Sequence, residues 1–440
     1  MKEALHMNKK KIGIAFFTIF VTFLTLSVQG EAGIDGLTGT TFNFTARSGY
    51  ISMPDGLNIY MWGYANGAGP MQHPGPTLIV NQGATVTINL TNQLSVPTSI
   101  VFPGQEGVIA GGGVVGLLTR EAAPLGGTVQ YQFTASQPGT YTYYSGTRPD
   151  LQVEMGLFGA IIVRPSLGSS YAYNHTNTQF KREYLFLISE IDPFIHQQVE
   201  LGQPVDTTDY FPVYWLINGR AAPDTLSAAF SALLPNQPYT SMAKAHPGEK
   251  ILVRMIGGGR DSHPFHLHGN NHTVIARDGR LLTSNLNKPA ATGPDIGESA
   301  FTTTVAPGQT FDGIFIWTGD GLGWDFYGHG RGDPPVSTEC VYNGIQNLSD
   351  PRCDHGKPLP VTLPEQAELT FGQFYAGSPF MGLAGSLPPG EGGFNPNSGF
   401  VFMWHSHSEK ELTNNNIFPG GMLTFMIMEH PNVIIEPSNP

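Results

Sequence analysis

The sequence predicts an all-β protein built from two β-sandwich domains. Short segments rich in Val, Ile, Thr, Tyr and Phe alternate with Gly, Pro and Asn, as in TLIVNQGATVTINLTNQL, and this spacing is typical of a sandwich. The 55 Gly and 35 Pro make up about a fifth of the 440 residues, and only 13% of the residues are charged, so long helices are not expected. At roughly 100 to 200 residues per domain, this length leaves room for two or three domains.

The N-terminus has the pattern of a secretory signal peptide, which we expect to cover residues 1–32. Lys9, Lys10 and Lys11 precede an apolar run that ends near Val28, and small residues follow it. The alternative is a transmembrane anchor, because the run is close to the shortest length that spans a bilayer. Both interpretations export the rest of the chain, so a periplasmic or extracellular location is expected.

The first sandwich domain is expected at residues 37–165 and the second at residues 180–440. Strand-like runs in the second domain include REYLFLISEID, EKILVRMIGG, QTFDGIFIWTG and MLTFMIMEH. A long Gly/Pro-rich insertion at about 319–399 lacks the period-two pattern of strands. It contains Cys340 and Cys353, the only two cysteines, and an oxidising compartment favours a local disulfide between them over two free thiols.

The charge and composition exclude several classes of partner. The 22 basic and 34 acidic side chains give a net charge of −12, which repels nucleic acid and anionic lipid. No second apolar segment of spanning length occurs, so no membrane association is expected after signal cleavage. A hydrophobic share of 40% excludes a disordered chain. The expected partner is therefore a small-molecule or small redox substrate.

Two histidine clusters predict a metal site. His263, His266 and His268 lie in HPFHLHG, and His405 and His407 lie in MWHSHSEKEL. Residues i and i+2 of a strand share a face, so each HxH pair presents two imidazoles, and two such strands side by side would form a four-imidazole site. Imidazole binds several first-row metals, and copper(II) binds most tightly, so copper is the expected cofactor. A single HxH pair could be ordinary surface or core histidines, but two pairs in apolar strands favour a metal site.

These motifs resemble those of the multicopper oxidases, a family of Greek-key β-sandwich domains with the cupredoxin fold. HPFHLHG is followed far downstream by an HxH and then by Gly421 and Met422, as in that family. The segments PGPTLIVNQGATVTINLTNQL, GTYTYYSG and EMGLFGAIIVRP resemble its first domain, so the likeness extends through nearly all of the exported chain. With two domains, the chain is similar to the two-domain laccases and copper nitrite reductases. Because those proteins are trimers, the resemblance makes a homotrimer an expected assembly.

The resemblance also implies roles for the histidines. The first His of the family's HPxHxHG motif binds the mononuclear type 1 copper, which implies that role for His263. The other two His of that motif, and the outer His of the family's HCH motif, bind the trinuclear cluster. The corresponding residues here are His266, His268, His405 and His407.

The sequence departs from the family at the type 1 site. Ser406 stands where the family has its Cys ligand, and Glu411 stands where it has the following His, so only His263 and Met422 remain. Rapid electron transfer by type 1 copper depends on the thiolate ligand. We therefore expect copper binding without an intense blue band.

The first domain also lacks the family's histidine pairs. Val101 and Pro103 occupy one pair of positions, and Tyr144 and Gly146 occupy the other. Only half of the trinuclear His ligands are retained, enough for one copper or a close pair. If the first domain covers the site, one side of the copper pocket is expected to be apolar or phenolic.

Three functions fit these residues. The first is an exported copper-dependent oxidoreductase in which a small reductant or oxygen species occupies an open coordination position. The second is a non-catalytic copper-binding or carrier protein, and the third is a structural double sandwich with a vestigial site. Four clustered imidazoles exceed what a scaffold needs, so the oxidoreductase ranks first, while the missing thiolate and His pairs leave catalysis an open question.

Overall fold

The computed structural model describes residues 34–319, 341–342, 345–346, 377–380, 399–429 and 433–435. Ala32–Pro440 form one compact unit, and the fold described here belongs to it. The predicted signal peptide, both cysteines and most of the predicted insertion lie outside the described residues. Within the described ranges, no helix is both long enough and apolar enough to cross a membrane.

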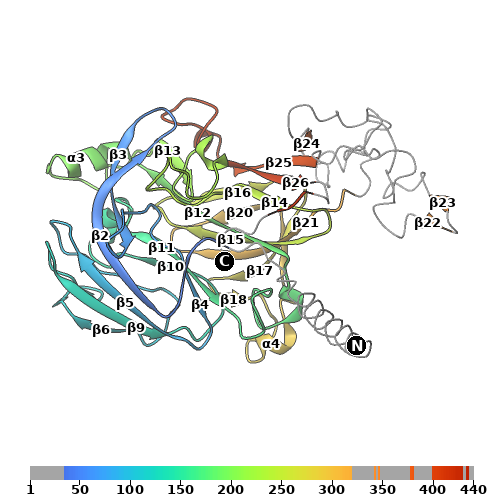
Figure 1. The fold of residues 1–440 in the computed structure, drawn as a ribbon, viewed down its shortest axis with the longest axis horizontal. Helices are drawn as coiled ribbons and strands as arrows, with labels where there is room; N and C mark the ends of the chain where they lie inside the picture. Colours follow the sequence, from blue (N-terminus) through green and yellow to red (C-terminus); the bar gives the residue numbers. More distant parts are fainter. Residues whose placement is uncertain are drawn as a thin grey trace, which may run out of the picture. The chain divides into compact units, whose positions relative to one another are not determined.

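The first sandwich consists of a five-stranded sheet, in the order β3-β2-β5-β9-β6, and a four-stranded sheet, in the order β1-β4-β11-β10 (Figure 1). Their strands are β1 (Leu37–Thr38), β2 (Thr41–Ser52), β3 (Asn58–Asn66), β4 (Leu78–Asn81), β5 (Thr85–Asn92), β6 (Ile109–Gly112), β9 (Thr128–Thr134), β10 (Gly139–Tyr144) and β11 (Phe158–Arg164). The alternation of β9 shows why these sequences form half-buried strands: Val129, Tyr131 and Phe133 are buried, and Gln130 and Gln132 between them are exposed. The buried face packs into the core between the two sheets.

The second sandwich consists of a seven-stranded and a six-stranded sheet. The larger sheet has the order β13-β12-β15-β21-β17-β18 with β19 beside β17, and the smaller has the order β14-β26-β25-β16-β20 with β24 beside β25. Their strands are β12 (Arg182–Ile191), β13 (Tyr214–Ile217), β14 (Ala243–Ala245), β15 (Lys250–Gly257), β16 (His263–Leu267), β17 (His272–Arg277), β18 (Arg280–Leu281), β19 (Glu298–Ala300), β20 (Thr302–Val305), β21 (Thr310–Ile316), β24 (Gly377–Phe380), β25 (Gly399–Ser406) and β26 (Leu423–Glu429). A second apolar core lies between these sheets. The prediction of an all-β fold with two sandwiches is confirmed, whereas the exact domain boundaries stay predictions.

The remaining elements are short. The small two-stranded sheets pair β7 (Val114–Val115) with β8 (Arg120–Glu121) and β22 (Val341–Tyr342) with β23 (Ile345–Gln346). The helices are α2 (Pro149–Gln152), α3 (Pro193–Glu200), α4 (Pro289–Thr292), η1 (Thr176–Thr178), η2 (Asp224–Leu226) and η4 (Glu409–Leu412). In α3, the Asp192 side chain caps the helix by accepting a hydrogen bond from Phe194 N, and Pro193 occupies the first turn, where its missing N–H costs nothing.

The two sandwiches pack against each other through strands that are apolar on both faces. In β11, Ile161 and Val163 face the core of the first sandwich, while Ala160 and Ile162 face the other way. That second face meets Leu187 of β12, from the seven-stranded sheet. Because both faces of these strands are buried, their sequences FGAIIV and YLFLI are apolar without interruption, whereas a strand with one solvent-exposed face would alternate apolar and polar residues.

A buried ion network also joins the sandwiches. The Arg254 side chain is fully buried, and its guanidinium is 3.0 Å from Glu183 Oε2 and 3.4 Å from Asp312 Oδ1. It also donates to the hydroxyl of Thr140, which belongs to the first sandwich, over 2.8 Å. Thr140 donates in turn to Asp312 over 2.5 Å. The seven-stranded sheet of the second sandwich is therefore the layer that meets the first sandwich.

Candidate metal centre

The pairing of β16 with β25 brings the two HxH motifs together. His266 lies directly opposite His405, and Leu267 lies opposite Trp404. Leu267 and Trp404 point into the apolar core toward the seven-stranded sheet. Because side chains alternate along a strand, His266 and His405 share the opposite face of the six-stranded sheet. The chain turns sharply after this motif at Gly269, whose φ is +103° and where a Cβ would approach the Phe402 ring to 2.9 Å.

Four imidazoles gather on this face. The ring centroid of His266 is 4.8 Å from that of His268, 4.9 Å from that of His407 and 5.5 Å from that of His405. The rings of His268 and His405 are 5.0 Å apart, and those of His405 and His407 are 5.8 Å apart. Three of these residues, His266, His268 and His405, are buried, whereas His407 is exposed. The open side of the cluster is therefore the side of His407.

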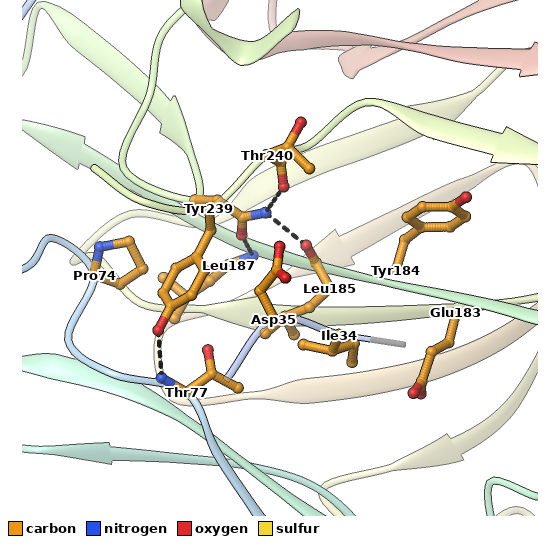
Figure 2. Close-up of a pocket in the computed structure, with 11 residues that line it drawn as sticks. Ile34, Asp35, Pro74, Thr77, Glu183, Tyr184, Leu185, Leu187, Tyr239 and Thr240 are labelled. Atoms are coloured by element: carbon orange, nitrogen blue, oxygen red, sulfur yellow. Dashed lines mark hydrogen bonds between the residues drawn. The ribbon is translucent and has the colours of Figure 1, made fainter. Parts of the chain in front are cut away.

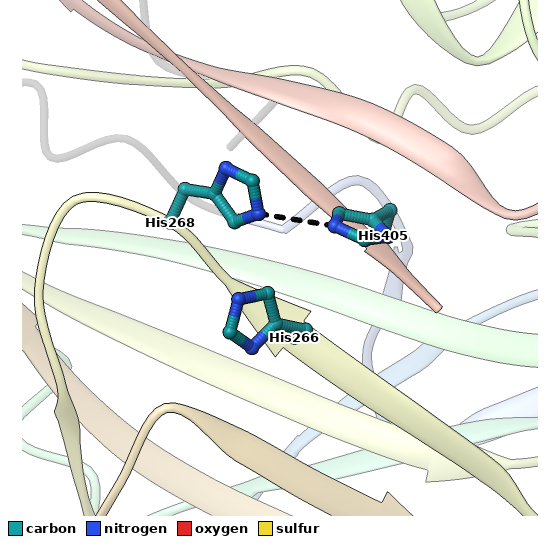
Figure 3. A group of neighbouring side chains, drawn as sticks. All are labelled: His266, His268 and His405. Atoms are coloured by element: carbon teal, nitrogen blue, oxygen red, sulfur yellow. Dashed lines mark hydrogen bonds between the residues drawn. The ribbon is translucent and has the colours of Figure 1, made fainter. Parts of the chain in front are cut away.

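Hydrogen bonds to Nδ1 set which ring nitrogens face the centre. Nδ1 of His405 is 2.5 Å from the backbone carbonyl of Ser406, and Nδ1 of His266 is 2.7 Å from the Thr302 hydroxyl. The Nε2 atoms of His405 and His268 approach to 3.0 Å (Figure 3). Nε2 is therefore the nitrogen that His405 and His266 offer to a metal.

The environment keeps two of the imidazoles, His266 and His405, in the neutral form that binds metals. Burial, together with the smaller effect of the neighbouring imidazoles of His268, His405 and His407, lowers the pKa of His266 to about 3. Burial also lowers the pKa of His405. Neutral imidazole has a lone pair for a metal, so these two ligands need lose no proton at neutral pH.

The dimensions fit a copper ion. One candidate ligand atom from each of His266, His268 and His405 lies within 4.8 Å of the other two. A first-row metal ion binds imidazole nitrogen at about 2.0–2.1 Å, so two adjacent ligands on one ion lie roughly 3 Å apart. The 3.0 Å between the Nε2 atoms of His268 and His405 matches this spacing. Small side-chain shifts would bring His266 onto the same ion, and His407 is positioned at the open side.

His263 lies apart from this cluster in both position and charge. It lies on the same face of β16 as Phe265 and Leu267, and this core face is opposite to the face of His266. Its Nε2 is 2.8 Å from Glu190 Oε2, and its Nδ1 is 2.9 Å from Glu411 Oε2. Both ring nitrogens are thus hydrogen-bonded to carboxylates, and neither is directed at a shared metal position.

Among the residues that the structure describes, Ser406 and Met422 occupy the rest of the expected type 1 position, and Ser406 has a hydroxyl where the family has a thiolate. The Ser406 hydroxyl donates to Glu411 Oε2 over 2.5 Å, and Met422 is fully buried in the apolar core. Of these described residues, His263 is engaged at both nitrogens and Ser406 has a hydroxyl in place of sulfur, so these two do not offer the ligands of a type 1 copper.

Within this chain Tyr144 packs elsewhere, and a lining of the copper pocket by a first domain stays a prediction. Tyr144 packs in the apolar cluster between the sandwiches, against residues such as Leu185 and Leu187 of β12. It also bridges Val101 within the first sandwich. The first sandwich therefore meets the seven-stranded sheet, whereas the imidazoles lie on the outer face of the six-stranded sheet.

A pocket at the boundary between the sandwiches is separate from the imidazole cluster. Tyr239 and Asn218 line it, and the Tyr239 hydroxyl accepts a hydrogen bond from Thr77 N over 2.9 Å (Figure 2). The other lining residues are Ile34, Asp35, Pro74, Thr77, Glu183, Tyr184, Leu185, Leu187 and Thr240. Its volume of about 40 Å³ holds a few waters and excludes an organic substrate.

Sequence reasoning missed two residues that shape this region. Glu190 was not recognised as a partner of His263, although a carboxylate in the apolar run YLFLISEI was a usable signal, because buried charges need partners. Thr302, which orients His266, gave no such signal, since Thr is common in strands.

The comparisons with known proteins identify the family. Models of multicopper oxidase domains match residues 46–168 and residues 216–312. A probable nitrite reductase-hydroxylamine oxidoreductase fusion protein of Kuenenia stuttgartiensis is 27% identical over 283 residues, which cover 62% of this chain and 30% of that protein. Copper resistance protein A of Pseudomonas syringae pv. tomato is 26% identical over 236 residues, which cover 48% of this chain and 38% of that protein.

The solved structures agree on the fold. The multicopper oxidase mgLAC superposes with a TM-score of 0.55 at 18% identity, covering 91% of this chain and 88% of that chain. The chain belongs to the multicopper oxidase family of copper oxidoreductases, and copper is its cofactor. It spans less than two fifths of the length of the two relatives described above, so their activities are not transferred to it.

Proposed function

We propose that this chain is an exported copper-dependent oxidoreductase with one histidine copper site and no type 1 copper. The observation that carries the proposal is the convergence of the His266, His268, His405 and His407 rings on one face of the six-stranded sheet. Four imidazoles on two paired strands are a ligand set for copper, and family membership supports the metal.

The residues around the site have different roles in the proposed function. Bound copper would supply one-electron exchange with a small reductant or an oxygen species. His405 and His266 are oriented by hydrogen bonds at Nδ1, and burial keeps them neutral. His407 is exposed, so a small substrate could reach the site from that side. Ser406, the residue between the two downstream ligands, has no sulfur that could form a blue site or carry electrons to a second copper.

Export and assembly are parts of the same proposal. The basic and apolar N-terminal pattern supports export to the periplasm or the extracellular space. The resemblance to two-domain members supports a homotrimer, and the net charge of −12 argues against nucleic acid as a partner. N-terminal sequencing of the mature protein and light scattering during size-exclusion chromatography test these two points.

A non-catalytic copper-binding protein is the second candidate. The replacement of the thiolate by Ser406 and the carboxylate contacts of His263 favour it, because neither of these described residues offers a type 1 copper the ligand that would pass electrons from a distant substrate. The two candidates share the copper site and differ only in turnover.

Copper titration of the purified, metal-stripped chain separates these functions. We expect tight binding of copper, and oxygen consumption with a phenol or ascorbate as reductant. His405→Ala should weaken copper binding by about 10-fold or more, since a ligand counts for at least as much as its supporting partners. His272→Ala is the matched control, because His272 is equally buried in the second sandwich and its Nε2 contacts Thr303 instead of the cluster.

The outcomes decide between the candidates. Copper binding without oxygen consumption would favour the carrier. Equal copper affinity in His405→Ala and His272→Ala would contradict the site itself.

A further inference from the structure

A buried polar network occupies the inner side of the strands that carry the imidazoles. It runs from Glu190 of β12 through His263 of β16 to Glu411 of η4 and on to Ser406 of β25. The successive contacts measure 2.8 Å, 2.9 Å and 2.5 Å. The one histidine, the two carboxylates and the serine hydroxyl thus satisfy one another. The four residues, which we call the inner clamp, tie four elements of the second sandwich together.

The far end of the inner clamp is fixed by further donors. Glu190 Oε1 accepts hydrogen bonds from the backbone N–H groups of Arg260 and Asp261, over 2.6 Å and 2.9 Å. It also accepts one from the Tyr210 hydroxyl over 2.8 Å. With His263 on its other oxygen, Glu190 is hydrogen-bonded through both oxygens. A carboxylate held this way is a rigid anchor for the rest of the network.

The charges within the inner clamp are complementary. Burial lowers the pKa of His263, but the hydrogen bonds to Glu190 and Glu411 outweigh burial and raise the pKa to about 9. The imidazole is therefore a cation between two carboxyl groups at neutral pH. Each carboxylate receives a charge-assisted hydrogen bond, the stronger kind. The clamp holds together through this cation and needs no metal.

Ser406 connects the inner clamp to a copper ligand. Its hydroxyl faces inward and donates to Glu411, while its backbone carbonyl accepts the hydrogen bond from Nδ1 of His405. Its N–H donates to Met422 O over 3.0 Å. The Ser406 peptide is thus held at three points, and the direction of its carbonyl decides which nitrogen of His405 carries the proton.

We propose that Ser406 and Glu411 are positioning residues for the copper site: with His263 and Glu190 they hold the Ser406 carbonyl on Nδ1 of His405 and so select Nε2 as the copper ligand. The inference rests on the proposed copper site, but the selection of the nitrogen already operates in the metal-free protein.

The first test uses the metal-free protein. Nitrogen NMR of ¹⁵N-histidine-labelled protein reports whether His405 carries its proton on Nδ1. We expect wild type to hold the Nδ1–H form, and Ser406→Ala and Glu411→Gln to show both tautomers. Ser241→Ala is the control, because Ser241 is a buried serine of the same sandwich whose hydroxyl donates to Thr225 O. An unchanged Nδ1–H form in both clamp variants would overturn the proposal.

The second test adds copper to the same proteins. Ser406→Ala should weaken copper binding by about 10-fold and shift the copper hyperfine splitting in electron paramagnetic resonance, as loss of a ligand's partner does elsewhere. Ser241→Ala should match wild type in both readouts. Affinity and spectrum unchanged in Ser406→Ala and Glu411→Gln would overturn the positioning role. If wild type itself binds no copper, the proposed function fails, and the NMR result still decides whether the clamp selects the tautomer.

Discussion

The charge of His263 predicts a pH dependence of stability that can be isolated in the metal-free protein. Its pKa is about 9 in the folded chain and 6.5 in the unfolded chain, because Glu190 and Glu411 hold its proton. Since a difference of one pKa unit corresponds to 1.36 kcal/mol, the protonated form contributes about 3 kcal/mol to the free energy of unfolding. The folded pKa is the higher one, so this contribution is fully present below pH 6.5 and is lost as the pH rises through about 9.

The perturbation is His263→Gln, measured by urea unfolding at pH 6, 7, 8, 9 and 10. Removing the cation leaves two carboxyl groups without their shared partner, so we expect the variant to be about 3–5 kcal/mol less stable than wild type at pH 6 to 7. The gap should then shrink by about 3 kcal/mol toward pH 10, because wild type loses its own proton. Backbone and Tyr210 donors remain on Glu190 in the variant, so its carboxylate stays ionised over this range.

The control for this measurement is His272→Gln. Burial lowers the pKa of His272 to about 4, so this residue is neutral in the folded protein throughout the range. Above pH 8 it is neutral in the unfolded chain as well, and the gap between this variant and wild type should be flat from pH 8 to pH 10. A wild-type to His263→Gln gap that stays constant or widens over the same interval would refute the cationic clamp.

Three further predictions follow from the same structure. The copper-loaded protein should lack an intense absorption band near the red end of the visible spectrum, because Ser406 replaces the thiolate; a strong band there would contradict this assignment. Arg254→Met should lower the free energy of unfolding by about 3–5 kcal/mol, because it leaves buried carboxylates at the sandwich boundary without their cation. Arg277→Met, at an exposed ion pair, should lower it by less than about 1 kcal/mol. Equal losses for the two variants in urea unfolding would contradict this prediction. Thiol titration of the unreduced, denatured chain should find no free thiol, because Cys340 and Cys353 are expected to form a disulfide worth about 3 kcal/mol by chain entropy; two titratable thiols would exclude it.

The fold was predictable from the sequence because strands with one solvent-exposed face keep a visible alternation of apolar and polar residues. The alternation of Val129, Tyr131 and Phe133 with glutamines is visible without a structure. The runs around Ile161 and Leu187 are apolar at every position, which shows burial but not which layers cover each face. Long-range packing decides that point, so the contact between the two sandwiches had to come from the structure.

The candidate site was predictable in its ligands but not in its surroundings. The HxH spacing placed His266 and His268 on one face, and the structure pairs that strand with the strand of His405. Period two also separates His263 from His266, since they are three residues apart, and this was the available signal that His263 points elsewhere. The carboxylate partners of His263 lie 73 and 148 residues away along the chain, so no local sequence pattern could have predicted these contacts.

Anomalous diffraction at the copper edge from crystals of the copper-loaded protein tests the central claim most directly. We expect a copper peak about 2 Å from Nε2 of His405 and of His268, with His266 and His407 within reach of the same ion or of a close second one. We expect no peak beside His263, whose nitrogens should remain on Glu190 and Glu411. A copper ion bound by His263, or no copper at the four imidazoles, would show that the proposed site is wrong.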